Sequence, residues 1–302
     1  MYFTSLPDHS DPAFDEETHF GRFGTTNIVF NAQSNGARCD NHVGCFSVKT
    51  VLRGEEWYGL DGRKVAVRPG QFLILNDGQR YSCWIEGKPV RTVSIFFAKE
   101  FVKLALQDLR NTEEESVDDP FGSGCDIPEF YQSLHSFDYP LQHRLRGLIS
   151  SLDAEGYVSG MVDERLMPLL SSLISVHRND VTLSKKVHGV KSSTQKEIFK
   201  RVSIARDTLH SCYREKPDLK FVGAISCLSV PQLVRQFRAV FGTSPHQYLN
   251  AIRLQNAFQL LQSTDLSVAD IALDCGFDNA NAFCRAFKSR YGMNSSRVRR
   301  RR

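Results

Sequence analysis

The sequence lacks several features that would assign it to a class at once. It has no apolar run of about eighteen residues and no basic-flanked apolar start, so neither a membrane-spanning helix nor a signal peptide is expected. Its eight cysteines include no C-x-x-C pair, which argues against a zinc or redox motif and predicts reduced, mostly buried thiols. These absences predict a soluble cytoplasmic protein.

The last third of the chain contains one pattern written twice. Residues 222–245 and 271–295 each include an aromatic residue, three other residues, a second aromatic residue and a glycine, at 237–242 and again at 287–292. Self-similarity of this kind marks a duplicated structural unit.

Each copy is predicted to form a short helix, a tight turn and a second helix. Ser229 and Asn279 precede the second helices as N-caps, because their side chains can accept a hydrogen bond from an otherwise unpaired backbone amide. Apolar residues then recur at spacings of three or four, which is the buried stripe of an amphipathic helix: Leu233, Phe237 and Val240, and then Phe283, Phe287 and Tyr291. The sequence thus predicts two helix-turn-helix units.

The stretch between the copies predicts a long connecting helix. Ser244, Pro245 and Gln247 supply an N-cap, a first-turn proline and a capping-box glutamine, and apolar residues continue to about Ser263. At 1.5 Å per residue this helix is roughly 27 Å long. The DNA major groove returns to the same side every ~34 Å, so one chain could place both second helices in successive groove segments.

These residues resemble a known family. The run 253–296 contains Arg-Leu-x-x-Ala, Leu-Leu, Ser-Val-Ala-Asp-Ile-Ala, Cys-Gly-Phe, Phe-Cys-Arg-Ala-Phe and Tyr-Gly, and it is similar to the signature of AraC/XylS-type transcriptional regulators. Two departures are Ser295, where the family has proline, and Cys227, at the small turn residue of the first unit. The resemblance implies double-stranded DNA, RNA polymerase and a second copy of the chain as partners. It also implies a cytoplasmic protein associated with the bacterial nucleoid.

The distribution of charge agrees with DNA binding, although the net charge of +4 decides little. From Thr194 onward there are 18 Lys and Arg against 8 Asp and Glu, about +10, which leaves 20 against 26, about −6, in the preceding residues. Phosphate contacts need a cationic region of this kind.

The faces opposite the two buried stripes carry the residues expected to read bases. The family resemblance places these positions in the major groove: Pro231, Gln232, Val234 and Arg235, and then Ala280, Asn281, Cys284 and Arg285. Arg prefers guanine, Asn and Gln prefer adenine, and the apolar members can contact thymine methyls. The alternative is that both arginines contact phosphates only. The basic tail 299–302 is expected to bind phosphates without regard to sequence.

Residues 26–102 have a different texture. Short runs rich in Val, Ile, Phe, Tyr and Trp recur about every ten residues and are separated by Arg-Gly, Asp-Gly and Pro-Gly turns, which predicts an antiparallel sandwich or barrel. The segment from Arg68-Pro-Gly to Asn76 resembles the second half of a cupin motif. The fold class is therefore a two-domain α+β protein, with an N-terminal antiparallel cupin-like β-barrel and a C-terminal all-α domain.

A catalytic cupin would need a metal, and the usual ligand set is absent. His42 stands alone, and Leu73 occupies about the place of the later histidine. We therefore expect no metal, no cofactor and no enzyme activity, but an apolar pocket for a small molecule. Each candidate lining residue has an alternative role as plain core: His42, Phe46, Trp57, Tyr58, Phe72, Tyr81 and Trp84.

Two leucine-rich helices are predicted at 140–152 and 161–176, joined as an antiparallel hairpin. They either form a dimer interface, with Leu169 and Leu173 in it, or simply cover the barrel. The domains are expected at 1–180 for effector binding and dimerisation, 181–193 for a linker, and 194–302 for DNA binding. The sequence thus predicts a transcription factor that responds to a small molecule. The alternatives are control by a partner protein or by dimerisation alone, and an enzyme with an added DNA-binding module.

Overall fold

The computed structural model describes residues 1–7, 15–111, 127–189 and 191–299. The chain folds into two compact units, Met1–Leu183 and Ser184–Arg302. None of the helices within the described residues is both long enough and apolar enough to cross a membrane.

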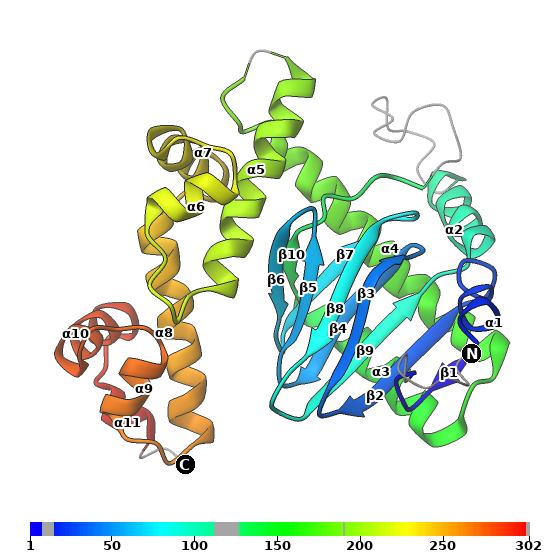
Figure 1. The fold of residues 1–302 in the computed structure, drawn as a ribbon, viewed down its shortest axis with the longest axis horizontal. Helices are drawn as coiled ribbons and strands as arrows, with labels where there is room; N and C mark the ends of the chain where they lie inside the picture. The colour runs from blue at the N-terminus through cyan, green and yellow to red at the C-terminus, as the bar shows by residue number, and fades with distance from the viewer. Residues whose placement is uncertain (8–14, 112–126, 190, 300–302) are drawn as a thin grey trace. The chain divides into compact units, whose positions relative to one another are not determined.

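The first unit contains two β-sheets (Figure 1). The six-stranded sheet has the order β1 (Tyr2–Phe3), β2 (Ile28–Ser34), β9 (Val90–Phe96), β4 (Ser47–Arg53), β7 (Gln71–Leu75) and β10 (Leu134–Ser136). The four-stranded sheet has the order β3 (Ala37–Val43), β8 (Arg80–Ile85), β5 (Glu56–Leu60) and β6 (Arg63–Val67). All these neighbours are antiparallel except β1 and β2, which are parallel.

Turn chemistry fixes the predicted strands in register. In the β5–β6 hairpin, Leu60 pairs with Arg63, and the two loop residues Asp61 and Gly62 have φ of 47° and 78°. Two successive positive φ angles match the twist of a tight hairpin, which explains the Asp-Gly sequence. The predicted antiparallel, cupin-like unit is confirmed, although its strands form two facing sheets and not one closed barrel.

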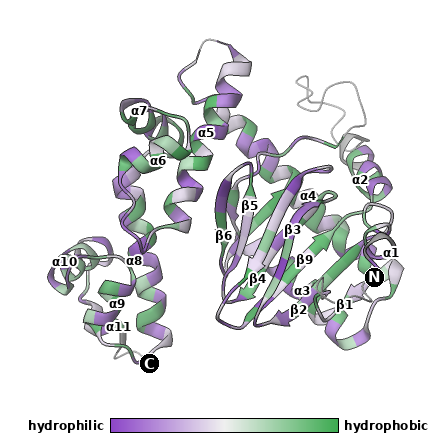
Figure 2. Ribbon diagram, viewed as in Figure 1, coloured by the Kyte–Doolittle hydropathy of each residue, from purple (hydrophilic) through white to green (hydrophobic). Residues whose placement is uncertain are grey.

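The sequence did not predict β3. Its residues Arg38, Asp40 and Asn41 are exposed and polar, and Figure 2 shows most of this strand as hydrophilic. As an edge strand of the four-stranded sheet, β3 needs no continuous apolar run.

Helices cover the outer face of the six-stranded sheet. The first unit has α1 (Glu16–Phe20), α2 (Lys99–Asn111), α3 (Tyr139–Glu155) and α4 (Ser159–Ser184). Apolar residues of α2, α3 and α4 form one core with every second residue of the sheet, including Val48, Phe72 and Val93. Leu169 and Leu173 belong to this core and are 2% and 0% exposed, so neither is available to a dimer interface. The hairpin covers the sheet.

Helix α4 continues to Ser184, into the range 181–193 expected to be a linker. Its last turns are polar in composition, and the polar side chains of His177, Asp180 and Ser184 are buried. The His177 ring lies 5.0 Å from the Phe130 ring, and Asp180 lies 3.6 Å from His135. Polar composition here reflects buried polar contacts within a helix.

The second unit is entirely helical where it is described. It contains α5 (Ser192–Ser211), α6 (Leu219–Ile225), α7 (Val230–Phe241), α8 (Pro245–Ser263), α9 (Val268–Asp274), α10 (Ala280–Tyr291) and α11 (Ser295–Arg299). The pairs α6–α7 and α9–α10 are the two predicted helix-turn-helix units, and α8 is the predicted connecting helix. This part of the predicted fold is confirmed.

Candidate functional site

The first helix-turn-helix unit is fixed by its helix caps and its buried stripe. The Asp218 side chain accepts a hydrogen bond from the Phe221 amide at 2.6 Å, and Ser229 begins α7 with a capping box. Leu233 and Phe237 are fully buried, and the Phe237 ring lies 5.3 Å from the Tyr248 ring on α8. Because this stripe is held against the core, the opposite face of α7 is turned to solvent.

The second unit repeats this arrangement. Ser267 caps α9, and the Asn279 side chain caps α10 by accepting from the Ala282 amide at 2.8 Å. Phe283 and Phe287 are fully buried in a core shared with α8, α9 and α11. Helix α10 ends at Gly292 with φ of 69°, as α7 ends at Gly242 with φ of 72°.

The residues predicted to contact DNA lie in the first two turns of α7 and α10. Six of the eight are exposed, and the other two, Val234 and Ala280, are half-buried. Arg235 and Arg285 occupy equivalent positions in helices that begin at 230 and 280. The structure thus gathers each group of four on one solvent-facing surface of a second helix.

Gln232 has a structural role besides its exposure. Its Oε1 accepts hydrogen bonds from the Ser229 amide at 3.2 Å and from the Ser229 hydroxyl at 3.0 Å. In the second unit the equivalent position is Ala282, which makes no such bond. Gln232 is therefore held at the start of α7 as a capping residue.

The sequence interpretation did not include two basic residues on these faces. Arg238 and Lys288 are exposed and lie three residues beyond Arg235 and Arg285, so each extends its surface by about one turn. The signal was present, because both residues follow the spacing of three and four that begins at Pro231 and Asn281.

Helix α8 joins the two units and positions them. It contacts α5 and α7 next to the first helix-turn-helix unit, and α9, α10 and α11 at the second. Arg253, which is buried on α8, donates from Nε to the Tyr213 carbonyl at 2.9 Å. Gly276, in the turn of the second unit, packs at the same point, since a Cβ there would lie 2.6 Å from the Tyr213 oxygen. One close-packed contact therefore holds the second unit to the end of α5.

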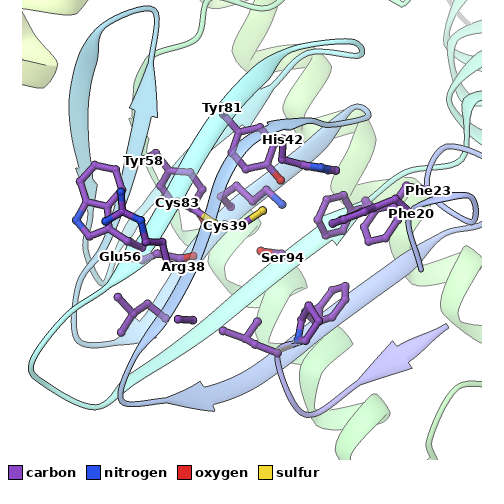
Figure 3. Close-up of a pocket in the computed structure, with 18 of the residues that line it drawn as sticks. Phe20, Phe23, Arg38, Cys39, His42, Glu56, Tyr58, Tyr81, Cys83 and Ser94 are labelled. Carbon is purple, nitrogen blue, oxygen red and sulfur yellow. The ribbon is translucent and has the colours of Figure 1, made fainter. Parts of the chain in front are cut away.

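The sheet-containing unit, Met1–Leu183, has a partly open cavity between its two sheets (Figure 3). The cavity has ≈ 80 Å³ in which the centre of a water-sized molecule can move. Strand alternation directs Lys49 and Ser94 of the six-stranded sheet and Glu56, Tyr58 and Cys83 of the four-stranded sheet into it. Phe20 and Phe23, from α1 and the turn after it, line another side.

A β-bulge brings His42 into the cavity. Cys39 pairs with Cys83 and His42 pairs with Tyr81, so β3 has one extra residue in this interval, and Asn41 has φ of 52°. An extra residue reverses which side chains point inward. The His42 ring then lies 4.0 Å from the Phe20 ring.

Lys49 and Glu56 are two buried residues of opposite charge that face this cavity. Burial lowers the pKa of Lys49 from 10.5 to about 8 and raises the pKa of Glu56. The Thr92 hydroxyl donates to Glu56 Oε2 at 2.6 Å, and the Tyr58 hydroxyl also donates to this carboxyl group. The Lys49 ammonium lies 3.5 Å from the centre of the Phe96 ring. The sequence interpretation missed Lys49 and Glu56, although Lys49 sits inside the apolar β4 run.

The structure brings together three of the seven residues predicted to bind an effector, because the side chains of His42, Tyr58 and Tyr81 point into the cavity. Trp84 borders the cavity, but its neighbour Cys83 points inward, so strand alternation places the Trp84 ring on the outer face of the four-stranded sheet. Trp57 stacks on Trp84, with ring centroids 6.3 Å apart, on the outer face of the four-stranded sheet. Phe46 and Phe72 belong to the core under the helices, because alternation turns them away from the facing sheet. Among the described residues no group of three or more His, Cys, Asp or Glu side chains could hold a metal ion.

Fold and sites together define a protein with a β-sheet unit that contains a partly open cavity and a helical unit with paired helix-turn-helix motifs. An AraC-like ligand binding domain model matches residues 42–170, and a helix-turn-helix domain model matches residues 223–301. The two models together match more than half of the chain, and the protein belongs to the AraC-type family of transcriptional regulators.

Individual relatives match mainly the second unit. The HTH-type transcriptional regulator MtrA of Neisseria gonorrhoeae is 40% identical over 81 residues, 27% of each chain. The HTH-type transcriptional activator RhaS of Enterobacter sp. (strain 638) is 35% identical over 91 residues, 30% of this chain and 33% of the relative. The match spans about a quarter to a third of the length of these curated relatives.

Among solved structures, the C-terminal domain of AraT, a response regulator from Geobacillus stearothermophilus, is 30% identical. It covers 34% of this chain and 85% of the AraT domain, with a TM-score of 0.33.

Proposed function

We propose that this protein is a sequence-specific regulator of transcription that binds double-stranded DNA with α7 and α10 in successive major-groove segments. The observation that carries the proposal is the repeated exposed face: equivalent turns of both helices present an arginine and its polar or small neighbours while the opposite faces are buried. An α-helix fits the major groove, and exposed Arg and Asn side chains can form bidentate contacts with bases.

The surrounding charge supports this proposal. Residues from Thr194 onward hold 18 Lys and Arg against 8 Asp and Glu. Arg238 and Lys288, one turn beyond the proposed base contacts, are suited to bind the flanking phosphates. The tail 300–302 and the side chain of Arg299, also expected to bind phosphates, lie outside the described residues.

The cavity between the two sheets is proposed to bind the effector, through His42, Tyr58 and Tyr81 together with Lys49 and Glu56. Its role is binding and not catalysis, with no metal or cofactor. Apolar and aromatic walls with a few polar groups are typical of small-molecule sites. Regulation by a partner protein, with an unused cavity, is the competing hypothesis.

The proposal also includes a homodimer, a contact with RNA polymerase and a cytoplasmic, nucleoid-associated location, all suggested by family membership. A dimer would have to use surfaces other than Leu169 and Leu173. Replacing either leucine with Glu would bury a charge in the core and unfold the first unit. Sedimentation of the unmodified chain tests the dimer directly.

Selection from a random double-stranded DNA library by the purified full chain tests the proposed function. We expect enrichment of a site with two blocks about 10 base pairs apart, because two groove segments on one side of DNA are one turn apart. The enriched site should bind roughly a thousandfold more tightly than random DNA of equal length. Enrichment of no sequence, or of a single block, would contradict the paired-helix arrangement.

A further inference from the structure

The cavity between the sheets contains a buried lysine, and this residue indicates which kind of molecule fits there. Lys49 comes from β4, is 2% exposed, and lines the cavity on the inner face of the six-stranded sheet. An ammonium group carries three hydrogen-bond donors. Burial of such donors without acceptors is unfavourable, so the chemical surroundings of Lys49 Nζ matter.

The nearest groups are two aromatic rings, and Cys83, Glu56, Cys45 and Cys39 are near enough to favour the charged form of Lys49. Nζ lies 3.5 Å from the centre of the Phe96 ring and 5.5 Å from that of Tyr81. Within the described part of the chain no carboxylate lies within ion-pair distance of Nζ and no oxygen accepts a hydrogen bond from it. Cation–π contacts stabilise the charge, but they leave the N–H donors without an oxygen acceptor.

Glu56, the other buried charged residue in the cavity, is in the opposite situation. It accepts hydrogen bonds from the Thr92 hydroxyl at 2.6 Å and from the Tyr58 hydroxyl. Glu56 is therefore already paired with two protein donors, whereas Lys49, which lines the same cavity from the facing sheet, has no such oxygen partner among the described residues. At neutral pH the lysine is mainly protonated, because its pKa is about 8.

Most of the remaining lining is apolar or aromatic and fits an apolar body, although His19, His42, Ser94 and the thiols of Cys39 and Cys83 also border the cavity. Phe20, Phe23, Phe30 and Phe96 surround one end, and Ile85 and Leu6 lie at another. Arg38, the remaining cation of the lining, is exposed and already paired with Asp40 at 2.7 Å. Lys49 is thus the one buried cation among the described lining residues.

We propose that the cavity binds a small organic carboxylate, with the carboxylate oxygens accepting hydrogen bonds from Lys49 and the apolar body packed against the phenylalanines. This inference rests on the proposed effector-binding role of the cavity and narrows it to one ligand class. A charge-assisted hydrogen bond to the buried Lys49 is stronger than a neutral one, so the carboxylate is distinguished from its amide.

The experiment is a thermal-shift and calorimetric titration of the full chain with matched pairs. The probes are the straight-chain acids from propanoate to octanoate and their phenyl-substituted counterparts, each beside its primary amide, with the corresponding amines and simple sugars as rival classes. We expect at least one acid to raise the melting temperature saturably and to bind about tenfold or more tightly than its amide.

Three variants connect binding to the lysine. Lys49→Met keeps the length of the side chain and removes a buried charge, so it should fold, and it should weaken the acid about tenfold while leaving amide binding unchanged. Lys49→Gln keeps a donor without the charge and should weaken the acid to a smaller extent. Lys64→Met is the control, since Lys64 is exposed on β6 with Nζ 5.6 Å from the Trp84 ring.

Three results would overturn the inference: no acid of the series binds, acid and amide bind equally, or Lys49→Met binds the acid as the unmodified chain does. Saturable binding of an amine or a sugar in place of the acids would leave the effector-binding role standing and reject the carboxylate. Failure of DNA site selection would reject the regulator itself, whatever the cavity binds.

Discussion

The two helix-turn-helix units repeat the same helices but differ in their turns. In the first unit, three residues (226–228) separate α6 from the cap of α7, and the left-handed position is Cys227, with φ of 52°. In the second unit, four residues (275–278) separate α9 from the cap of α10, and the left-handed position is Gly276, with φ of 82°. The same motif is therefore closed in two ways.

The difference follows from what each turn contacts. Cys227 is exposed, so a side chain can be accommodated there at the cost of backbone strain. Gly276 packs against the Tyr213 carbonyl and the Arg253 guanidinium, where no Cβ fits. The first unit has a further contact that the second lacks, because Gln236 binds the backbone of His188 at both ends of its amide, and Ala286 stands at the equivalent position. The second helix-turn-helix unit is thus attached through its turn to Tyr213 and Arg253. The first is attached through its second helix, α7, to the backbone of His188.

The largest expected effect is that of Gly276→Ala. The new Cβ would lie 2.6 Å from the Tyr213 oxygen, on a residue in the left-handed conformation. We therefore expect the free energy of unfolding of the second helix-turn-helix unit to fall by about 2 to 4 kcal/mol. Hydrogen exchange of α9 and α10 amides in the full chain measures this loss. Gly292→Ala is the control, because Gly292 has a similar φ of 69° but open space around it. Equal losses in the two variants would show that strain alone, and not the packing at Tyr213, makes Gly276 necessary.

Gln236→Leu should have an intermediate effect on stability, confined to the first helix-turn-helix unit. The variant removes the bond from the His188 amide to Gln236 Oε1 (3.0 Å) and the bond from Gln236 Nε2 to the His188 carbonyl (3.1 Å). We expect a loss of roughly 1 to 2 kcal/mol and faster exchange of the His188 amide. The exposed Gln255→Leu on α8 is the matched control. An unchanged exchange rate at His188 would show that the two Gln236 hydrogen bonds do not hold the first helix-turn-helix unit in place.

Cys227→Gly should have the smallest effect on stability, and of opposite sign. Glycine relieves the left-handed strain at φ of 52°, although it adds conformational freedom to the unfolded chain. We therefore expect the free energy of unfolding of the first helix-turn-helix unit to rise by roughly 0.5 to 1 kcal/mol. Slower exchange of the α6 and α7 amides would register that gain. A loss of stability would mean that the Cys227 side chain contributes more than its strain removes.

The sequence was sufficient for the helical unit because its signals are local. The cap at Ser229, the cap at Asn279 and the stripe through Phe237 each lie within a few turns of the residues they organise. The spacing of three and four therefore indicated both which face is buried and which face is free.

The six-stranded sheet was harder to predict in detail because both of its faces are covered. Strands β4 and β7 are buried at nearly every position, so apolar character did not separate Phe72, under the helices, from Leu73, between the sheets. Only the packed structure shows which alternate residues of each strand face the helices and which face the other sheet. His42 reached the cavity through a bulge at Asn41, and a bulge shifts register in a way that composition does not reveal.

The central claim is that α7 and α10 read bases, and Arg235→Ala and Arg285→Ala test it most directly on the selected site and on random DNA of equal length. We expect each variant to lose about 1 to 3 kcal/mol of binding free energy on the selected site and much less on random DNA. Arg290→Ala is the control, because Arg290 lies on α10 about 140° around the helix axis from Arg285. Equal losses on the two DNAs for both arginine variants would assign these residues to phosphates and contradict the claim.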